Sequence, residues 1–370
     1  MKGMTAKRLM VLSVGYGKGH HSAAGALAEY YERCGWDARV IDVCEMAHPL
    51  WFRLTQLFYD CCVRFLPWLW RITYDLTDTA DWRVLVKRPL LRRVVACLKE
   101  QLDSYRPDLV ICTYPLFAYM LDELHEQSGA QIPYAVVVTD AREISRPWAR
   151  SAARLVIVPD AGSRRMLIDR YAMEEERVSV GGFPVRQCFR VDGDRPQPSV
   201  TGLRILYGAY RQIRGVEDDI RSLLCAFPGL HLTVLAGRRE HALRRVFSEY
   251  EASGRLLILR ETDQMADYMR ESHFYIGKAG AATMFECYAC GVPVLVNFAL
   301  PGQEQGNLEL LVEEACGCPV ESTQHLIATL ENLLADEARG WNGLCTAMKR
   351  AGRTDACRRI ADIMARVFQV

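Results

Sequence analysis

Two histidines and a group of glycines follow the first apolar segment of the chain. The stretch GYGKGHHSAAGAL runs from Gly15 to Leu27. Gly17 and Gly19 would let the backbone approach a sugar diphosphate closely. His20 could serve as a general base, because imidazole titrates near neutral pH. The stretch lacks the Gly-Lys-Ser/Thr ending of a P-loop and does not fit GxGxxG. It predicts a strand-to-helix turn that carries a histidine toward a ligand site.

Asp140 is the second candidate for proton transfer. It follows the apolar run Tyr134–Val138, which is typical of a buried strand. Ligands of open α/β sheets bind at the carboxyl ends of strands, so the carboxylate is expected to face the site. Two assignments stay open. His20 is the base or positions the acceptor, and Asp140 orients His20 or is itself the base.

The second half of the chain has a pattern typical of nucleotide-sugar binding. A predicted strand ends near Ile276, small residues follow, and a helix is expected from Ala281 to a terminal Gly291. The N–H groups at such a helix start, together with Lys278, would bind a diphosphate. Glu286 would accept hydrogen bonds from ribose. The residues expected to bind the donor here are Lys278, Gly280, Ala281, Thr283 and Glu286.

Two further segments are expected to contact the donor. The loop PGQEQGN follows the strand VPVLVNF, and its polar side chains suit sugar hydroxyls: Gln303, Glu304 and Asn307. The segment LYGAYRQIRG begins the second half, with Gly208 at a tight turn and Arg211 available to bind phosphate by charge.

These residues need a scaffold in which strands alternate with helices. Short aliphatic runs separated by helical segments occur in both halves of the chain, which predicts an α/β fold of two doubly wound, Rossmann-like domains. The domains would face an interdomain cleft. The expected boundaries are 1–188 for an acceptor and membrane-binding domain, 189–202 for a Pro- and Gly-rich linker, and 203–370 for the donor domain. The last helix could pack back on the first domain.

An aromatic and basic insert, His48–Arg93, interrupts the alternation. Pro67 is expected to end a helix there. Two interpretations stay open: a helical excursion packed on its own domain, or an amphipathic anchor lying in the membrane interface. In the second, each basic residue near anionic lipid contributes ~1 kcal/mol. The candidate membrane-binding residues are Trp51, Phe52, Phe58, Phe65, Trp68, Trp70, Arg88, Arg92 and Arg93.

The composition of the chain indicates which compartments and which partners are compatible with it. The net charge of +1 over 370 residues predicts no nucleic-acid partner. The 14 cysteines lie mostly in apolar runs, which favours buried thiols in a reducing compartment. No run reaches the ~18 apolar residues that would span a bilayer. We therefore expect a cytoplasmic protein attached peripherally to the inner face of the cell membrane.

No metal or other cofactor is expected. The sequence Asp192-Gly-Asp194 lies in the predicted linker and is interpreted as a solvated turn. His21 is expected on the surface of the helix start, because adjacent helical residues point apart and do not share a metal. CYAC, at Cys287–Cys290, has no second pair to complete a zinc site.

The donor-binding pattern resembles the signature of glycosyltransferase family 28. It reads Lys278-Ala-Gly, Glu286, Gly291-Val-Pro, Pro301-Gly-Gln-Glu and Asn307. The branch most similar is that of the monogalactosyldiacylglycerol synthases and processive diacylglycerol glucosyltransferases. The glycine-histidine stretch, RPDLVICTYPL, VVVTDA and VSVGGFPVRQCF occur in that branch's order, and the insert sits where it carries a membrane-binding segment.

The resemblance implies a GT-B fold and an inverting transferase of the EC 2.4.1 type. It implies UDP-glucose or UDP-galactose as co-substrate and the 3-hydroxyl of diacylglycerol, or a related lipid, as acceptor. The sequence departs from the family pattern at two places, and both bear on the identity of the sugar and of the acceptor. Tyr210 and Arg211 stand where the family has a glycine-rich loop, and the segment AREISRPWARSA after Asp140 lacks the histidine that this branch often carries there.

Three other functions fit the same elements. One is a GT-B transferase acting on another lipid-linked acceptor, such as a polyprenyl-diphosphate intermediate. The second is an enzyme like a UDP-sugar 2-epimerase, which needs no membrane segment, so an insert packed inside the protein would favour it. The third is a non-catalytic sensor of sugar nucleotides.

Overall fold

The computed structural model describes residues 6–16, 19–129, 132–191, 193, 197–199, 202–210 and 213–369. The chain divides into two compact units. Unit 1 comprises Met1–Arg186, Pro301–Gly306 and Asp355–Val370, and unit 2 comprises Gln187–Leu300 and Asn307–Thr354. Pro301–Gly306 and the last helix therefore belong to unit 1, although the first lies between the two segments of unit 2 in the sequence and the second follows them.

Unit 1 is built on a six-stranded parallel sheet of order β2-β1-β3-β4-β5-β6. Its strands are β1 (Arg8–Leu12), β2 (Asp37–Ile41), β3 (Leu109–Cys112), β4 (Tyr134–Val137), β5 (Leu155–Val158) and β6 (Val178–Val180). Its helices are α1 (Gly19–Arg33), α2 (Val43–Ala47), α3 (Pro49–Phe65), α4 (Pro67–Thr79), α5 (Trp82–Leu85), α6 (Pro89–Tyr105), α7 (Pro115–Ser128), α8 (Ala161–Tyr171) and α16 (Ala356–Phe368), with the 3₁₀ turns η1 (Arg146–Ala149) and η2 (Glu175–Arg177).

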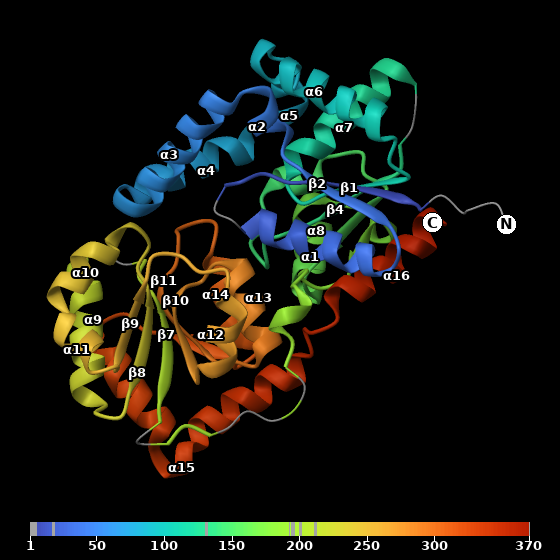
Figure 1. Cartoon of the computed structure of the whole chain (residues 1–370). Helices are drawn as coiled ribbons and strands as arrows, with labels where there is room; N and C mark the ends of the chain where they lie inside the picture. The colour runs from blue at the N-terminus through green and yellow to red at the C-terminus, as the bar shows by residue number, and fades with distance from the viewer. Residues whose placement is uncertain are drawn as a thin grey trace. The chain divides into compact units, whose positions relative to one another are not determined.

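Both faces of this sheet are covered, which explains its aliphatic strands. Leu9 and Val11 of β1 pack in one apolar cluster with α1 and α16. Met10 and Leu12 point the other way, into a second cluster that includes side chains of α6 and α7. Successive strand residues alternate between faces, so a strand buried on both sides is apolar throughout. Figure 1 shows α1 and α16 side by side in unit 1.

Unit 2 holds a second parallel sheet, of order β12-β11-β10-β7-β8-β9. Its strands are β7 (Arg204–Gly208), β8 (His231–Leu235), β9 (Leu256–Leu259), β10 (Phe274–Lys278), β11 (Val294–Phe298) and β12 (Gly317–Pro319). Its helices are α9 (Ile213–Ala226), α10 (Glu240–Val246), α11 (Ser248–Ala252), α12 (Met265–Glu271), α13 (Ala281–Cys290), α14 (Gln305–Glu313, whose first two residues lie in unit 1) and α15 (Thr323–Ala351), with η3 (Gln187–Phe189) and η4 (Gly237–Arg239).

The predicted pair of doubly wound α/β units is confirmed. Every strand expected from the sequence is present, with ends that differ by a few residues. The predicted break at Pro67 is also found, because α3 ends at Phe65 and α4 begins at Pro67. The end of the insert is divided between α5 and α6. Pro89 occupies the first turn of α6, where its missing N–H costs nothing.

Candidate active site

The strand order places one ligand site on each unit. In unit 1 the chain leaves β1 toward β2 on one side, and β3 lies on the other. In unit 2, β7 lies between β8 and β10. Such reversals open crevices at the carboxyl ends of the two central strands, where α/β proteins bind ligands. The residues that follow β1, β3 and β4 therefore form one candidate site, and those that follow β7 and β10 form another.

His20 lies in the first turn of α1, and its ring is held on several sides. Its Nδ1 is 2.6 Å from Oγ1 of Thr139, which follows β4. The ring centroid is 5.1 Å from that of Tyr114, edge to face, and 6.3 Å from that of Trp148. Burial lowers the pKa of the imidazole from 6.5 to about 4. His20 is therefore neutral at physiological pH and able to accept a proton.

Asp140 is buried beside the same tryptophan. The indole Nε1 of Trp148 donates a hydrogen bond to Oδ2 of Asp140 at 2.9 Å. Burial raises the pKa of the carboxyl to about 7, the negative charge of Glu304 adds to the rise, and the Trp148 hydrogen bond opposes it. One alternative, that Asp140 orients His20, is not what the structure shows, because Thr139 contacts Nδ1. Trp148 instead contacts both candidate catalytic residues.

Glu304 comes to Asp140 on the segment Pro301–Gly306. Two glycines let this segment lie close to the rest of unit 1. A Cβ on Gly306 would collide with the carbonyl of Ala141, and one on Gly302, whose φ is +83°, would lie 3.0 Å from Cδ of Arg71. Within the described residues, Oε1 of Gln303 is buried with no hydrogen-bond partner. Gln303 and Glu304, which are expected to bind the sugar, thus lie in the same unit as His20, whereas Asn307 lies in unit 2.

Gly15 and Tyr16, which follow β1, are held by the inner side of α3. Tyr16 Oη and Thr55 Oγ1 are 2.8 Å apart, and Gln56 Nε2 donates to the Gly15 carbonyl at 3.2 Å. A Cβ on Gly15 would lie 2.9 Å from that amide nitrogen and 3.6 Å from the ring of Phe52. Gly19 is the first residue of α1. Gly17 lies outside the described residues.

Phe52 is a correction to the predicted membrane-binding set. It is only 1% exposed, because its ring packs 5.2 Å from that of Tyr16 on the inner side of α3. Trp70 is partly buried, with its ring edge-on to Tyr59. The side chain of Phe65 lies outside the description.

The rest of the insert presents an exposed apolar surface. Trp51, Phe58 and Trp68 are exposed, the last at 61%. Arg88, Arg92 and Arg93 are exposed as well. Aliphatic side chains extend this surface, and sequence reasoning that looked for aromatics missed them, although their spacing of three or four residues in α3 and α4 was a usable signal. They are Leu50, Leu54, Leu57, Ile72 and Leu76.

In unit 2, the ends of β7 and β10 converge. A Cβ on Gly208 would lie 2.7 Å from the ring of Tyr210 and 2.9 Å from Oη of Tyr275, so only glycine fits. The Nζ of Lys278, at the end of β10, lies over the ring of Tyr210 at 5.6 Å from its centroid. Two segments far apart in the sequence thus bring a cation and a ring to the same edge of the sheet. Arg211 lies outside the described residues.

The helix that begins beyond β10 is positioned as the sequence predicts. α13 starts at Ala281 after Gly280, which supplies no capping side chain, and ends before Gly291, whose φ is +66°. Thr283 is in the first turn and partly exposed, whereas Glu286 is buried. Asn307 is buried too, and its Nδ2 donates to the carbonyl of Ala279 at 2.9 Å. Asn307 therefore braces the turn before α13, and its contact with a donor stays a prediction.

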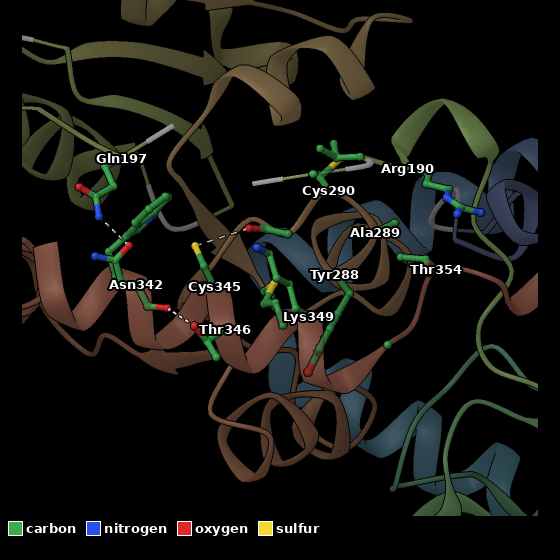
Figure 2. Close-up of a pocket in the computed structure, with 16 residues that line it drawn as sticks. Arg190, Gln197, Tyr288, Ala289, Cys290, Asn342, Cys345, Thr346, Lys349 and Thr354 are labelled. Carbon is green, nitrogen blue, oxygen red and sulfur yellow. Dashed lines mark hydrogen bonds between the residues drawn. The ribbon is translucent and has the colours of Figure 1, made fainter. Parts of the chain in front are cut away.

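A hollow of about 690 Å³ lies elsewhere on unit 2 and holds none of the predicted site residues. Figure 2 shows its lining side chains from the end of α13, from α15 and from the segment after η3, including Tyr288, Asn342 and Lys349. Among the described residues, no group of three or more His, Cys, Asp or Glu could hold a metal ion. No helix of the described parts is long and apolar enough to cross a membrane.

Family models match both units of this chain. The model for monogalactosyldiacylglycerol (MGDG) synthase matches residues 20–185, and that for the C-terminal domain of glycosyltransferase family 28 matches residues 223–364. The chain belongs to glycosyltransferase family 28. The predicted enzyme class, a UDP-sugar-dependent hexosyltransferase, is thereby confirmed.

Similar curated proteins carry the name of one glycosyltransferase activity. The processive diacylglycerol beta-glucosyltransferase of Bacillus subtilis (strain 168) is 24% identical over 351 residues, which cover 90% of this chain and 88% of that protein. The protein of the same name from Staphylococcus carnosus (strain TM300) is 23% identical over 347 residues, with coverage of 90% and 85%.

Solved structures with the same fold include both transferases and epimerases. The structure of Acinetobacter baumannii MurG covers 97% of this family 28 chain and 99% of its own, with a TM-score of 0.62 and 13% identity. The UDP-GlcNAc 2-epimerase from Neisseria meningitidis, bound to UDP-GlcNAc, gives a TM-score of 0.60 at 14% identity, with coverage of 97% and 100%. At these identities the likeness supports the predicted two-domain GT-B fold and decides nothing about the reaction.

Proposed function

We propose that this protein transfers glucose or galactose from a UDP-sugar to diacylglycerol or a related membrane lipid, with inversion, at the cytoplasmic face of the membrane. One observation carries the proposal: the unit that holds His20 and Asp140 also carries the exposed apolar surface of α3 and α4. A lipid hydroxyl is thus to be expected where a neutral histidine can take its proton. The names of the similar glucosyltransferases point to the same acceptor.

In this proposal unit 2 binds the nucleotide. The start of α13 is not capped by a side chain, and Lys278 lies at the end of the neighbouring strand. Helix N–H groups and a fixed cation can stabilise the charge that develops on a departing diphosphate with little reorganisation. We expect Gly208 and Gly280 to allow close approach and Glu286 to bind the ribose. The proposed reaction needs no metal, so chelation is expected to leave the rate unchanged.

His20 is proposed as the base. It is partly exposed and neutral above about pH 4. Asp140 is only 8% exposed, one of its oxygens accepts from Trp148, and half of it stays protonated near pH 7. As the acceptor oxygen bonds to C1 of the sugar, its proton passes to Nε2 of His20. The bond from C1 to the diphosphate oxygen breaks, and UDP leaves with that electron pair. Attack opposite the leaving group inverts C1.

The exposed surface of the insert is proposed to lie in the headgroup region. An amphipathic surface that buries aromatic and aliphatic side chains there gains affinity in proportion to its apolar area. Arg88, Arg92 and Arg93 would add attraction to anionic lipid. An epimerase would have no use for this surface, which is exposed although Phe52 of the insert packs inside unit 1. That observation favours the transferase.

The test is a panel of labelled UDP-sugars incubated with diacylglycerol in anionic vesicles and resolved by thin-layer chromatography. We expect one labelled glycolipid, from UDP-glucose or UDP-galactose, whose anomer is opposite to that of the donor. Label transferred only to a polyprenyl-linked lipid would show that this lipid, and not diacylglycerol, is the acceptor. Conversion of the UDP-sugar to its 2-epimer without a lipid product would show that the reaction is epimerisation and not transfer.

A further inference from the structure

A buried threonine lies against the catalytic histidine proposed above. Thr139 Oγ1 is 2.6 Å from Nδ1 of His20 and 3.4 Å from the carbonyl oxygen of Thr113. Both threonines are almost fully buried. A hydroxyl has one proton to donate and two lone pairs to accept with. The direction of this single proton decides which nitrogen of His20 carries hydrogen.

The Thr113 carbonyl selects one direction. A carbonyl oxygen only accepts, so Thr139 satisfies it by donating its own proton, and its oxygen is then left to accept from Nδ1–H. The Thr113 hydroxyl donates to the carbonyls of Leu12 and His20. The Thr139 hydroxyl, which donates to the Thr113 carbonyl, is therefore an acceptor toward Nδ1.

We propose that Thr139 is a positioning residue that holds His20 as the Nδ1–H tautomer, so that the lone pair of Nε2 is available to the acceptor hydroxyl. The tautomer itself follows from the contacts within unit 1, whereas its use in proton transfer rests on the proposed function. In the other tautomer Nε2 would carry hydrogen and could not take a proton. The hydrogen bond at one ring nitrogen commonly fixes the state of the other.

The surrounding structure makes this arrangement rigid. Thr113 directly follows β3, and Thr139 lies two residues after β4, so both backbones are held by the same sheet edge. Tyr114 and Trp148 confine the ring on its faces and edges. Turning the ring to exchange its nitrogens would require these aromatics to move. Because the ring is already held in place, Thr139 has only to fix which ring nitrogen carries the proton.

The test compares Thr139→Val, which removes the hydroxyl and keeps the shape, with Thr139→Ser, which keeps the hydroxyl. The tautomer is read from ¹⁵N chemical shifts of labelled histidine, and His20→Asn identifies the His20 signals among the 8 histidines. We expect Nδ1–H in the wild type and in Thr139→Ser. In Thr139→Val we expect a mixture of tautomers and a kcat lower by roughly 10²-fold at nearly unchanged KM.

The variants must first be shown to be folded, by circular dichroism and by unchanged binding of UDP. An Nε2–H signal in the wild type would overturn the proposal. So would a Thr139→Val protein that keeps both the Nδ1–H signal and the wild-type kcat. If the wild type glycosylates no lipid, the proposed function fails, while the ¹⁵N spectra still decide whether Thr139 controls the tautomer.

Discussion

The two units differ in the side chains that they carry at the reversal of strand order, although the two sheets have similar topologies. At the reversal of strand order in unit 1, buried titratable side chains gather: His20 with a lowered pKa and Asp140 with a raised one. At the reversal in unit 2, small residues and an uncapped helix start stand next to Lys278. The first arrangement suits the movement of a proton, and the second suits the binding of a fixed negative charge. Replacing one residue at a time can separate the two roles.

The largest effect is expected from His20→Ala. Loss of a general base should lower kcat by roughly 10²- to 10⁴-fold, while the affinity for UDP, measured by calorimetry, stays within about twofold. The exposed neighbour provides the control, because His21→Ala should leave both quantities near the wild-type values. If His20→Ala loses UDP affinity instead of kcat, the proposed division between the units is wrong.

Lys278→Ala should produce the opposite pattern. A hydrogen bond to a charged group contributes about 1.5–3 kcal/mol, so UDP affinity should fall by roughly 10- to 100-fold. The pH profile of the remaining activity should not move. Lys349→Ala is the matched control, since that lysine is exposed on α15 of the same unit. Equal losses in the two variants would refute a specific phosphate contact.

Membrane attachment should depend on the exposed side of α4 and not on exposed apolar residues in general. Trp68→Ala with Leu76→Ala should weaken co-sedimentation with anionic vesicles by about tenfold or more, given about 1.5 kcal/mol or more per fully buried large side chain. Leu257→Ala, at an exposed position of β9 in unit 2, should have no effect. Replacement of Arg88, Arg92 and Arg93 by glutamate should weaken vesicle binding only at low salt. Binding insensitive to both sets of changes would leave the insert without its proposed role.

The pH dependence separates the two candidate bases. With His20 as base, kcat/KM should rise with a pKa of about 4, and any second limb near pH 7 belongs to Asp140. Asp140→Asn should remove the limb near pH 7 and keep the limb near pH 4. If the variant instead loses all activity while it still binds UDP, Asp140 is the base and His20 positions the acceptor.

The smallest effect is expected on stability. The pKa of Asp140 in the folded protein, about 7, is above its value of 3.8 in an unfolded chain, so the folded state binds this proton more tightly. Between about pH 4 and pH 7 the unfolded chain loses this proton while the folded protein keeps it, so the free energy of unfolding falls across that range, by a few kcal/mol at most. Asp140→Asn should exceed the wild type in Tm at pH 8 and match it near pH 4. A difference in Tm that is independent of pH would contradict the raised pKa of Asp140.

Much of the scaffold could be predicted because its signals are local. Apolar runs between helical segments located the strands of both sheets, and Gly291 marked the end of α13. The turn after Lys278 could be predicted for the same reason, since small residues between a strand and a helix predict a turn that exposes backbone N–H groups. Thr139 was passed over, although it directly precedes Asp140.

The sequence by itself determined two doubly wound units, the turns after β1 and β10, and the presence of His20, Asp140 and Lys278 at those strand ends. Tertiary structure decided which side chains meet. It turned Phe52 inward onto Tyr16, placed Thr139 at the imidazole, and brought Glu304 to Asp140. These contacts join residues far apart in the chain. They depend on the rotation of each helix and on the packing of each loop, which local spacing does not specify.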